Sequence, residues 1–214
     1  LILQLLTVHN SGFANPCVLN DGPWRAKDRS YPNKISCRQL NVMAQSPGYD
    51  FDIFISYAHN DNAQIFGGLG WVDVFEDQLF KWLGKRRGLT DLQIWRDKRR
   101  MRGNTVFDDA IQKALDSSAI FLALTSRNYL KSEYCKKELR RFHRYHSRHS
   151  GGLRVSDSSR LFNILLENIP YTDWPAELEG TSGFCMNDGE ADNTLGDFTS
   201  PDDKSGAFNN QLRP

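Results

Sequence analysis

Glu138 is the acidic residue whose place in the sequence most suggests chemistry. It lies in the segment 132–148, where the apolar residues Cys135, Leu139 and Phe142 recur at the spacing of one helical face. At about 100° per residue, a helix over this segment puts Glu138 at the margin of that buried face. A carboxyl group in such a place needs either a basic partner or a task, because burying a lone charge is costly.

Two interpretations of Glu138 stay open from the spacing alone. The first is an ion pair with a nearby base such as Lys137 or Arg141, since structural ion pairs outnumber catalytic carboxylates. The second is an acid that acts on a ligand, with Tyr134 one turn earlier on the same side of the helix. Glu133 has a simpler explanation, because a solvent-facing acid in the first turn of a helix interacts favourably with the helix dipole.

Three other groups of residues are weaker candidates. The glycine-rich stretch 67–70 has neither the spacing of a dinucleotide-binding turn nor the lysine of a phosphate loop, so it predicts a flexible loop. The three histidines His143, His146 and His149 lie among arginines that repel cations, and no metal site is expected. The basic residues in 85–87 and 96–102 lack interleaved aromatic residues, and no nucleic-acid partner is expected.

The segments around these residues alternate between strand-like and helix-like patterns. Short runs rich in β-branched and aromatic residues predict strands at 51–55, 92–95, 119–124 and 161–166, with a fifth near Phe184. Apolar residues at helical spacing predict helices at 71–83, 107–115 and 132–148. Gly84 is expected to stop the first of these helices, and Ser132 is expected to cap the last.

This alternation predicts an α/β fold with a flavodoxin-like, five-stranded parallel sheet in the order 2-1-3-4-5 and helices on both faces. In that order the chain reverses its direction between strands 1 and 3, and ligands bind beyond the C-terminal ends of those strands. We therefore expect the functional residues in 56–62, a loop after the first strand, and in 125–138, after the third.

Composition excludes several classes of protein. The chain of 214 residues and 24.5 kDa carries 27 Lys and Arg against 26 Asp and Glu, so it is not a globally basic nucleic-acid binder. No apolar run reaches the ~18–20 residues that cross a bilayer, and no membrane segment is expected. Its four cysteines are scattered without a C-x-x-C pair, which argues against a disulfide framework or a zinc site. The cytoplasm is the expected compartment.

The composition shifts twice along the chain and predicts three parts. Residues 1–48 form an irregular N-terminal segment, and residues 49–186 form the folded domain. Residues 187–214 are polar and low in apolar positions, which is typical of a tail or linker. The chain begins with Leu1 and its first methionine is Met43, so we expect the natural product to begin at Met43 and residues 1–42 not to be native.

Four stretches in order resemble the TIR (Toll/interleukin receptor) domain family, of the bacterial kind, over about residues 49–184. Residues 51–57 (FDIFISY) resemble the family's opening strand, and Trp95-Arg96-Asp97 followed by Arg102-Gly103 resembles the second strand and its BB loop. Residues 126–139 resemble the S-x-W-C-x-x-E-L stretch, and 182–184 the end of the last strand. The sequence departs from the family at Arg102, usually proline, and at Tyr134, usually tryptophan, and it lacks the Phe-Trp pair of animal receptors.

The resemblance implies an NAD+ glycohydrolase that cleaves the nicotinamide–ribose bond, giving nicotinamide and ADP-ribose or a cyclic ADP-ribose, in signalling or defence. It implies that NAD+ is a substrate and that no resident cofactor or metal takes part. The family's catalytic glutamate corresponds to Glu138. The substrate-binding residues that the resemblance implies are Ser56, Tyr57, Asp97, Gly103, Phe107, Tyr134 and Cys135.

The resemblance leaves a second function open, that of a non-enzymatic adaptor that binds other TIR domains in signal transduction. In the enzymatic members activity depends on self-association, because neighbouring subunits complete the pocket. The implied partners are therefore NAD+ and further TIR domains, either copies of this chain or other proteins. A phospho-acceptor receiver domain shares the sheet order, but the third predicted strand ends in Leu124-Thr125-Ser126, without the required aspartate.

Overall fold

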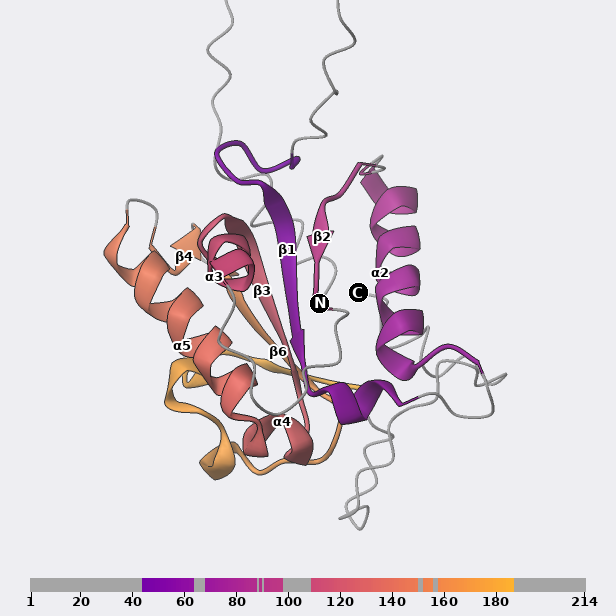
Figure 1. Cartoon of the computed structure of the whole chain (residues 1–214), viewed down its shortest axis with the longest axis vertical. Coiled ribbons are helices and arrows are strands. Elements are labelled where there is room, and N and C mark those ends of the chain that lie inside the picture. Colours follow the sequence, from indigo (N-terminus) through magenta and orange to yellow (C-terminus); the bar gives the residue numbers. More distant parts are fainter. Residues whose placement is uncertain are drawn as a thin grey trace, which may run out of the picture.

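A parallel sheet of five strands forms the centre of the computed structural model, which describes residues 44–63, 68–87, 89, 91–97, 109–149, 152–155 and 158–186 (Figure 1). Its strands are β1 (Phe51–Tyr57), β2 (Ile94–Trp95), β3 (Ser118–Thr125), β6 (Leu161–Leu165) and β7 (Gly183–Cys185), in the spatial order β2-β1-β3-β6-β7. All neighbouring pairs are parallel. Counted along the chain within this sheet, the order is 2-1-3-4-5, so the predicted fold is confirmed.

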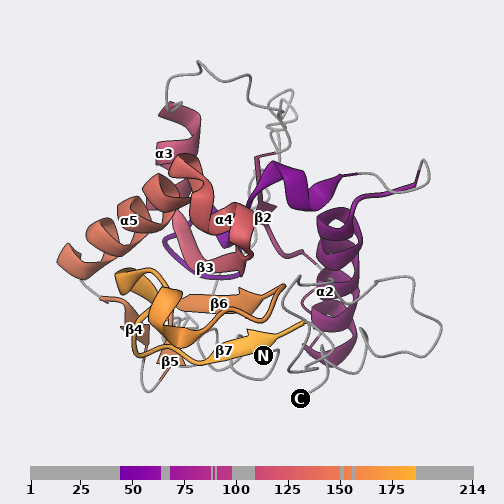
Figure 2. The same cartoon turned by 90° about the horizontal axis from the view of Figure 1, so that it is seen from below.

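Helices cover both faces of the sheet. Side chains alternate along each strand, so that the strands present apolar residues to both faces. Ile53 and Ile55 of β1 pack in one core cluster with the apolar face of α2 (Trp71–Arg87). Phe54, between them, packs in the other cluster with α3 (Asp109–Asp116) and α5 (Glu133–Arg148). Figure 2 shows α2 apart from α3 and α5. The central strand β3 is buried at every position, as its near-continuous apolar run predicts.

Shorter elements complete the described fold. The helix α4 (Arg127–Lys131) follows β3 and is capped by Ser126, whose hydroxyl accepts a hydrogen bond from the Tyr129 backbone N–H. Ser132 caps α5 in the same way, as predicted. The remaining elements are the 3-10 helices η1 (His59–Asn62), η2 (Tyr171–Asp173) and η3 (Ala176–Leu178) and the antiparallel pair β4 (Arg154–Val155) and β5 (Ser158–Ser159). No helix in the described part is long and apolar enough to cross a membrane.

Several predicted boundaries are wrong, each for a physical reason. The first strand runs on through Ser56 and Tyr57, because these residues pair with Ala123 and Leu124 of β3 rather than entering a loop. The helix α2 continues past Gly84, since one glycine costs a helix only about 1 kcal/mol and Leu83 is buried against the sheet. The strand β2 has two residues rather than four, and the β4–β5 pair is too short to leave a sequence pattern.

Some predictions concern residues outside the described ranges. The predicted helix 107–115 can be compared only from its residue 109 onward, where α3 begins. The domain boundaries at 48 and 187 and the expected start at Met43 stay predictions.

The carboxylate of Asp52 fastens the start of β1 to its neighbours. This side chain is fully buried, and it accepts hydrogen bonds from the backbone N–H groups of Gln45 (3.1 Å), Ser46 (2.8 Å) and Gln93 (2.9 Å). The first two donors belong to the turn before β1, and the third belongs to the segment that leads into β2. One acid therefore holds three pieces of backbone together at the N-terminal end of the sheet.

We expect Asp52→Ala to lower the free energy of unfolding by about 2 to 4 kcal/mol, because three buried backbone donors lose their acceptor. Chemical denaturation followed by circular dichroism measures this loss. Asp50→Ala is the matched control, since Asp50 is exposed and two residues away, and it should change stability by less than about 0.5 kcal/mol. Equal losses in the two variants would contradict the role given to Asp52.

Candidate functional site

A cavity of about 370 Å³ opens at the C-terminal ends of β1 and β3, where the sheet order predicts a ligand site. Residues from β1, η1, the end of the β2 segment, α4 and α5 line it. Its walls include Tyr57, Asp97, Tyr134, Cys135 and Glu138, which the sequence predicts as site residues.

The loops that follow β1 and β3 are joined directly beside this cavity. The carboxylate of Asp61 accepts hydrogen bonds from the Ser126 hydroxyl (2.5 Å) and from the Asn128 side-chain amide (2.7 Å). Asp61 is buried, and its burial raises the pKa of the carboxyl group above the usual range. The two segments in which functional residues are expected, 56–62 and 125–138, thus come together.

Glu138 is buried at the edge of the cavity and is bound by a hydroxyl. Only 8% of the residue is exposed, and Ser56 Oγ of β1 donates a hydrogen bond of 2.5 Å to Glu138 Oε2. The two candidate bases on its own helix bind elsewhere. Arg141 pairs with Asp116, with its Nε 2.8 Å from Asp116 Oδ1, and the Lys137 ammonium lies 5.6 Å from the centre of the Tyr134 ring.

The predicted alternative of an ion pair between Glu138 and Lys137 or Arg141 is therefore wrong. Within the described ranges, no Lys or Arg lies at salt-bridge distance from Glu138. Among the described residues, the buried acid thus has no base of the kind that usually offsets such a cost.

Burial controls the protonation of Glu138. Loss of contact with water raises the pKa of Glu138 from its ordinary 4.5 to about 8, the hydrogen bond from Ser56 opposes the shift, and the negative charge of Asp97 adds to it. Near neutral pH the Glu138 carboxyl group is thus mainly protonated. A cation placed beside Glu138 would favour the carboxylate form, because opposite charges stabilise each other in a poorly solvated site.

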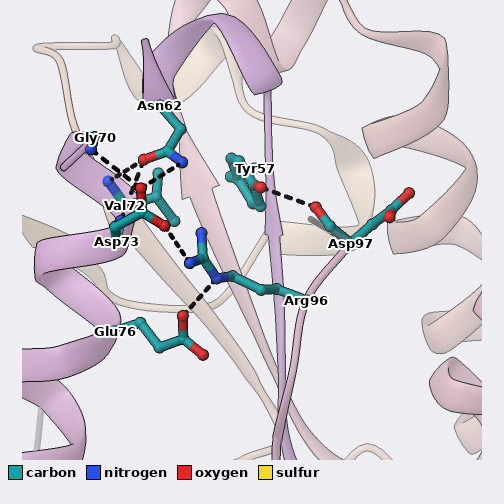
Figure 3. A network of polar contacts seen from close by, with 8 residues as sticks. All are labelled: Tyr57, Asn62, Gly70, Val72, Asp73, Glu76, Arg96 and Asp97. Carbon is teal, nitrogen blue, oxygen red and sulfur yellow. Dashed lines mark hydrogen bonds and ion pairs between the residues drawn. The ribbon is translucent and has the colours of Figure 1, made fainter. Parts of the chain in front are cut away.

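Arg96 organises the opposite wall through a second polar network (Figure 3). Its guanidinium contacts the carboxylates of Asp73 and Glu76 on α2, the latter at 2.5 Å, and it lies over the Tyr57 ring at 5.8 Å. The Tyr57 hydroxyl donates a hydrogen bond of 2.8 Å to the backbone carbonyl of Asp97. The contacts tie the end of β2 to α2 and hold Asp97 at the cavity.

The run 96–102 suggests a basic patch in the sequence. Arg96, however, is not an exposed member of such a patch. It is 9% exposed and its charge is neutralised by two acids. The N-terminus of α2 is fixed beside it by Asn62, whose amide oxygen accepts hydrogen bonds from the backbone N–H groups of Val72 (2.8 Å) and Asp73 (3.2 Å). Gly70 is required next to this cap, because a Cβ there would lie 2.2 Å from Asn62 Oδ1.

The other predicted site residues divide into two groups. Tyr134 is partly buried with its side chain at the cavity, whereas Cys135 is 3% exposed and burial raises the pKa of its thiol, which keeps it protonated. Gly103 and Phe107 lie outside the described residues. Ser56 is the predicted residue that contacts Glu138 directly, although it lies in β1 and not in a loop.

The cavity is also lined by residues that the sequence analysis did not single out, namely Ala58, His59, Asn60, Asn128 and Lys131. All lie in the segments 56–62 and 125–138, so position after the strands was the signal that could have identified them. Among the described residues, no group of three or more His, Cys, Asp or Glu side chains could hold a metal ion. His146 is buried with its ring 4.2 Å from that of Phe142, and burial lowers its pKa to about 4.

Comparisons with known proteins bear on this arrangement. A family model described as TIR domain matches residues 53–181, which is more than half of the chain and includes the residues that line the cavity. A comparison with curated proteins finds no match.

The buried acid makes stability depend on pH. Because folding raises the pKa of Glu138, the folded state holds a proton that the unfolded chain releases, and stability falls as pH rises from about 5 to about 8. Glu138→Gln removes this titration. We expect the variant to match the wild type at about pH 5 and to exceed its free energy of unfolding by about 2 to 4 kcal/mol at about pH 9.

Denaturant titrations of both proteins at the two pH values measure this difference. Glu133→Gln is the matched control, because it removes a carboxylate with a side chain 66% exposed on the same helix, and its effect should be small at both pH values. A difference between wild type and Glu138→Gln that does not grow with pH would show that the acid is not held in its protonated form.

Proposed function

The chain belongs to the TIR domain family, and from this premise we propose that it is an NAD+ glycohydrolase, which cleaves the bond between nicotinamide and ribose. The observation that carries the proposal is Glu138, a buried acid at the edge of the cavity that Ser56 holds by a 2.5 Å hydrogen bond. An acid that is buried in a cleft, with no paired base among the described residues, is a candidate functional group because its burial adds little to stability.

The proposed reaction suits a single carboxylate. Nicotinamide in NAD+ carries a positive charge, so it leaves as a neutral molecule with the electron pair of the broken C–N bond and requires no general acid. The ribose carbon becomes oxocarbenium-like, and an anion beside the ring lowers the energy of that transition state. Water then adds to the carbon and loses a proton, giving ADP-ribose. A cyclic ADP-ribose forms if a nitrogen of the adenine attacks in place of water.

The electrostatics of the cavity suit a positively charged substrate. The positive nicotinamide ring favours the charged form of Glu138, so binding converts the acid to the carboxylate that the reaction needs. Tyr134, at the cavity wall, presents an aromatic ring that can stack on the nicotinamide or adenine ring. Tyr57 and Asp97 would frame the ribose from the side of the Arg96 network.

TIR domains generally bind other TIR domains, and we propose that self-association of this chain supports activity. Two neighbouring subunits would then complete the pocket that one chain begins. The alternative function, a non-enzymatic adaptor between TIR domains, uses the same association without chemistry. The two functions differ in one measurable product, which is nicotinamide.

Glu138→Gln should lower the rate of nicotinamide release by at least about 100-fold, because the amide cannot supply a negative charge to the transition state. The measurement is chromatography of nicotinamide and ADP-ribose after incubation of purified protein with NAD+. The control is Glu133→Gln, an acid on the same helix that does not line the cavity, which should keep the wild-type rate. Equal rates in Glu138→Gln and wild type would remove Glu138 from the reaction.

The pH profile gives a second test. The carboxylate form of Glu138 is the reactive one, so kcat/KM should rise with pH and level off above an apparent pKa near 8, the value set by burial in the free protein. The midpoint for kcat should lie lower, since bound NAD+ brings its positive charge next to the acid. A profile that falls over the same range would contradict the assignment.

Specific activity should rise with protein concentration in the micromolar range, in parallel with oligomer size measured by light scattering. If the wild-type protein forms oligomers but releases no nicotinamide at any concentration, the enzymatic proposal fails and the adaptor function remains.

A further inference from the structure

Tyr129 is a buried residue of the site that does not line the cavity. It is fully buried in α4, and its hydroxyl lies 3.4 Å from Ser56 Oγ, which in turn lies 2.5 Å from Glu138 Oε2. Three side chains from β1, α4 and α5 thus form a continuous line of polar atoms that ends at the acid. Only the last of them, Glu138, belongs to the cavity wall.

When Glu138 is ionised, the number of available protons determines which group donates and which accepts in each of these two hydrogen bonds. A carboxylate only accepts hydrogen bonds, and a serine hydroxyl has a single proton, so Ser56 must donate to Glu138. Ser56 can then meet Tyr129 only as an acceptor, and Tyr129 is the donor. Burial raises the pKa of the Tyr129 phenol well above its ordinary value, which keeps the proton on it at every working pH.

We propose that Tyr129 is a positioning residue that acts on Glu138 through Ser56, by directing the one proton of Ser56 at the carboxylate. A hydrogen bond received by Ser56 polarises its own O–H and strengthens the bond that it gives to Glu138. The hydrogen bonds from Tyr129 to Ser56 and from Ser56 to Glu138 therefore stabilise the ionised form of Glu138 and fix the position of its carboxylate. The inference rests on the proposed function, in which that charge faces the ribose.

Other ionisable groups lie around Glu138; of these, Asp97 raises its pKa through its negative charge, and Cys135 contacts Ser56. Those of the described residues that face this region are Tyr57 of β1, His59 and Asp61 of η1, Asp97 after β2, Lys131 of α4, Tyr134, Cys135 and Lys137 of α5 and Glu177 of η3. The Tyr129 hydroxyl also interacts electrostatically with Cys135 and Glu177, so Tyr129→Phe is compared with and without Ser56 to isolate the path through Ser56.

The pH profile of kcat/KM in four proteins tests the proposal: wild type, Tyr129→Phe, Ser56→Ala and the double variant. Tyr129→Phe should shift the acid limb of the profile to higher pH by roughly 0.5 pH unit. This shift corresponds to about a threefold loss of kcat/KM at about pH 6.5 and no loss at about pH 9.5. Ser56→Ala should move the acid limb further. In the double variant, Tyr129→Phe should add nothing, since its path to Glu138 is already cut.

Two outcomes would overturn the proposal. One is a loss in Tyr129→Phe that is the same at every pH, which indicates a general structural effect. The other is an equal effect of Tyr129→Phe with and without Ser56, which indicates that the tyrosine acts by another route. Tyr171→Phe is the matched control, because its hydroxyl is bound to the Gly180 N–H (3.1 Å) at an exposed site, and its profile should equal the wild type.

A titration that needs no activity separates this proposal from the proposed function. The carboxyl carbon of Glu138 can be followed by carbon-13 NMR in glutamate-labelled protein, with Glu138→Gln to assign the signal. Its midpoint should rise by roughly 0.5 pH unit in Tyr129→Phe. If wild type releases no nicotinamide, the enzymatic function fails while this result still decides the role of Tyr129. An unchanged midpoint would refute the role of Tyr129.

Discussion

Glu138 is buried beside the sheet with no paired base in the part of the chain that the structure describes, and the rest of the site depends on this constraint. Desolvation of Glu138 costs free energy, and one short hydrogen bond from Ser56 offsets only part of that cost. The remainder is carried by the surrounding core, in which β3 is buried at all of its positions and α5 packs Leu139 and Phe142 against it. The cost of burying Glu138 is therefore offset by the packing of the surrounding core.

Arg96 shows how the same fold treats a charge that has only a structural task. It is as buried as Glu138, but two carboxylates on α2 neutralise it, and its contacts join β2, α2 and the Tyr57 ring. The contrast is informative, because Glu138 has a hydroxyl where Arg96 has counter-charges. Arg96 and Glu138 are thus distinguished by whether opposite charges compensate them, and not by how deeply they are buried.

Local patterns predicted the sheet order, the α5 helix with its cap, and the place of Glu138 at the margin of the buried helical face, because alternation and helical spacing reflect neighbours in the chain. They did not predict that Ser56 contacts Glu138 or that Arg96 binds Asp73, since these partners are 82 and 23 residues apart. The place of Tyr129 was missed for the same reason. Pairings of this kind are set by tertiary packing, which leaves no periodic trace in the sequence.

The sheet ends in very short strands, with two residues in β2 at one edge and three in β7 at the other. Edges of this length offer few free backbone N–H and C=O groups, so a second sheet has little to pair with. Copies of this chain that meet would therefore do so through side chains on helices and loops. Contacts of that kind are formed and released more readily than a shared β-sheet.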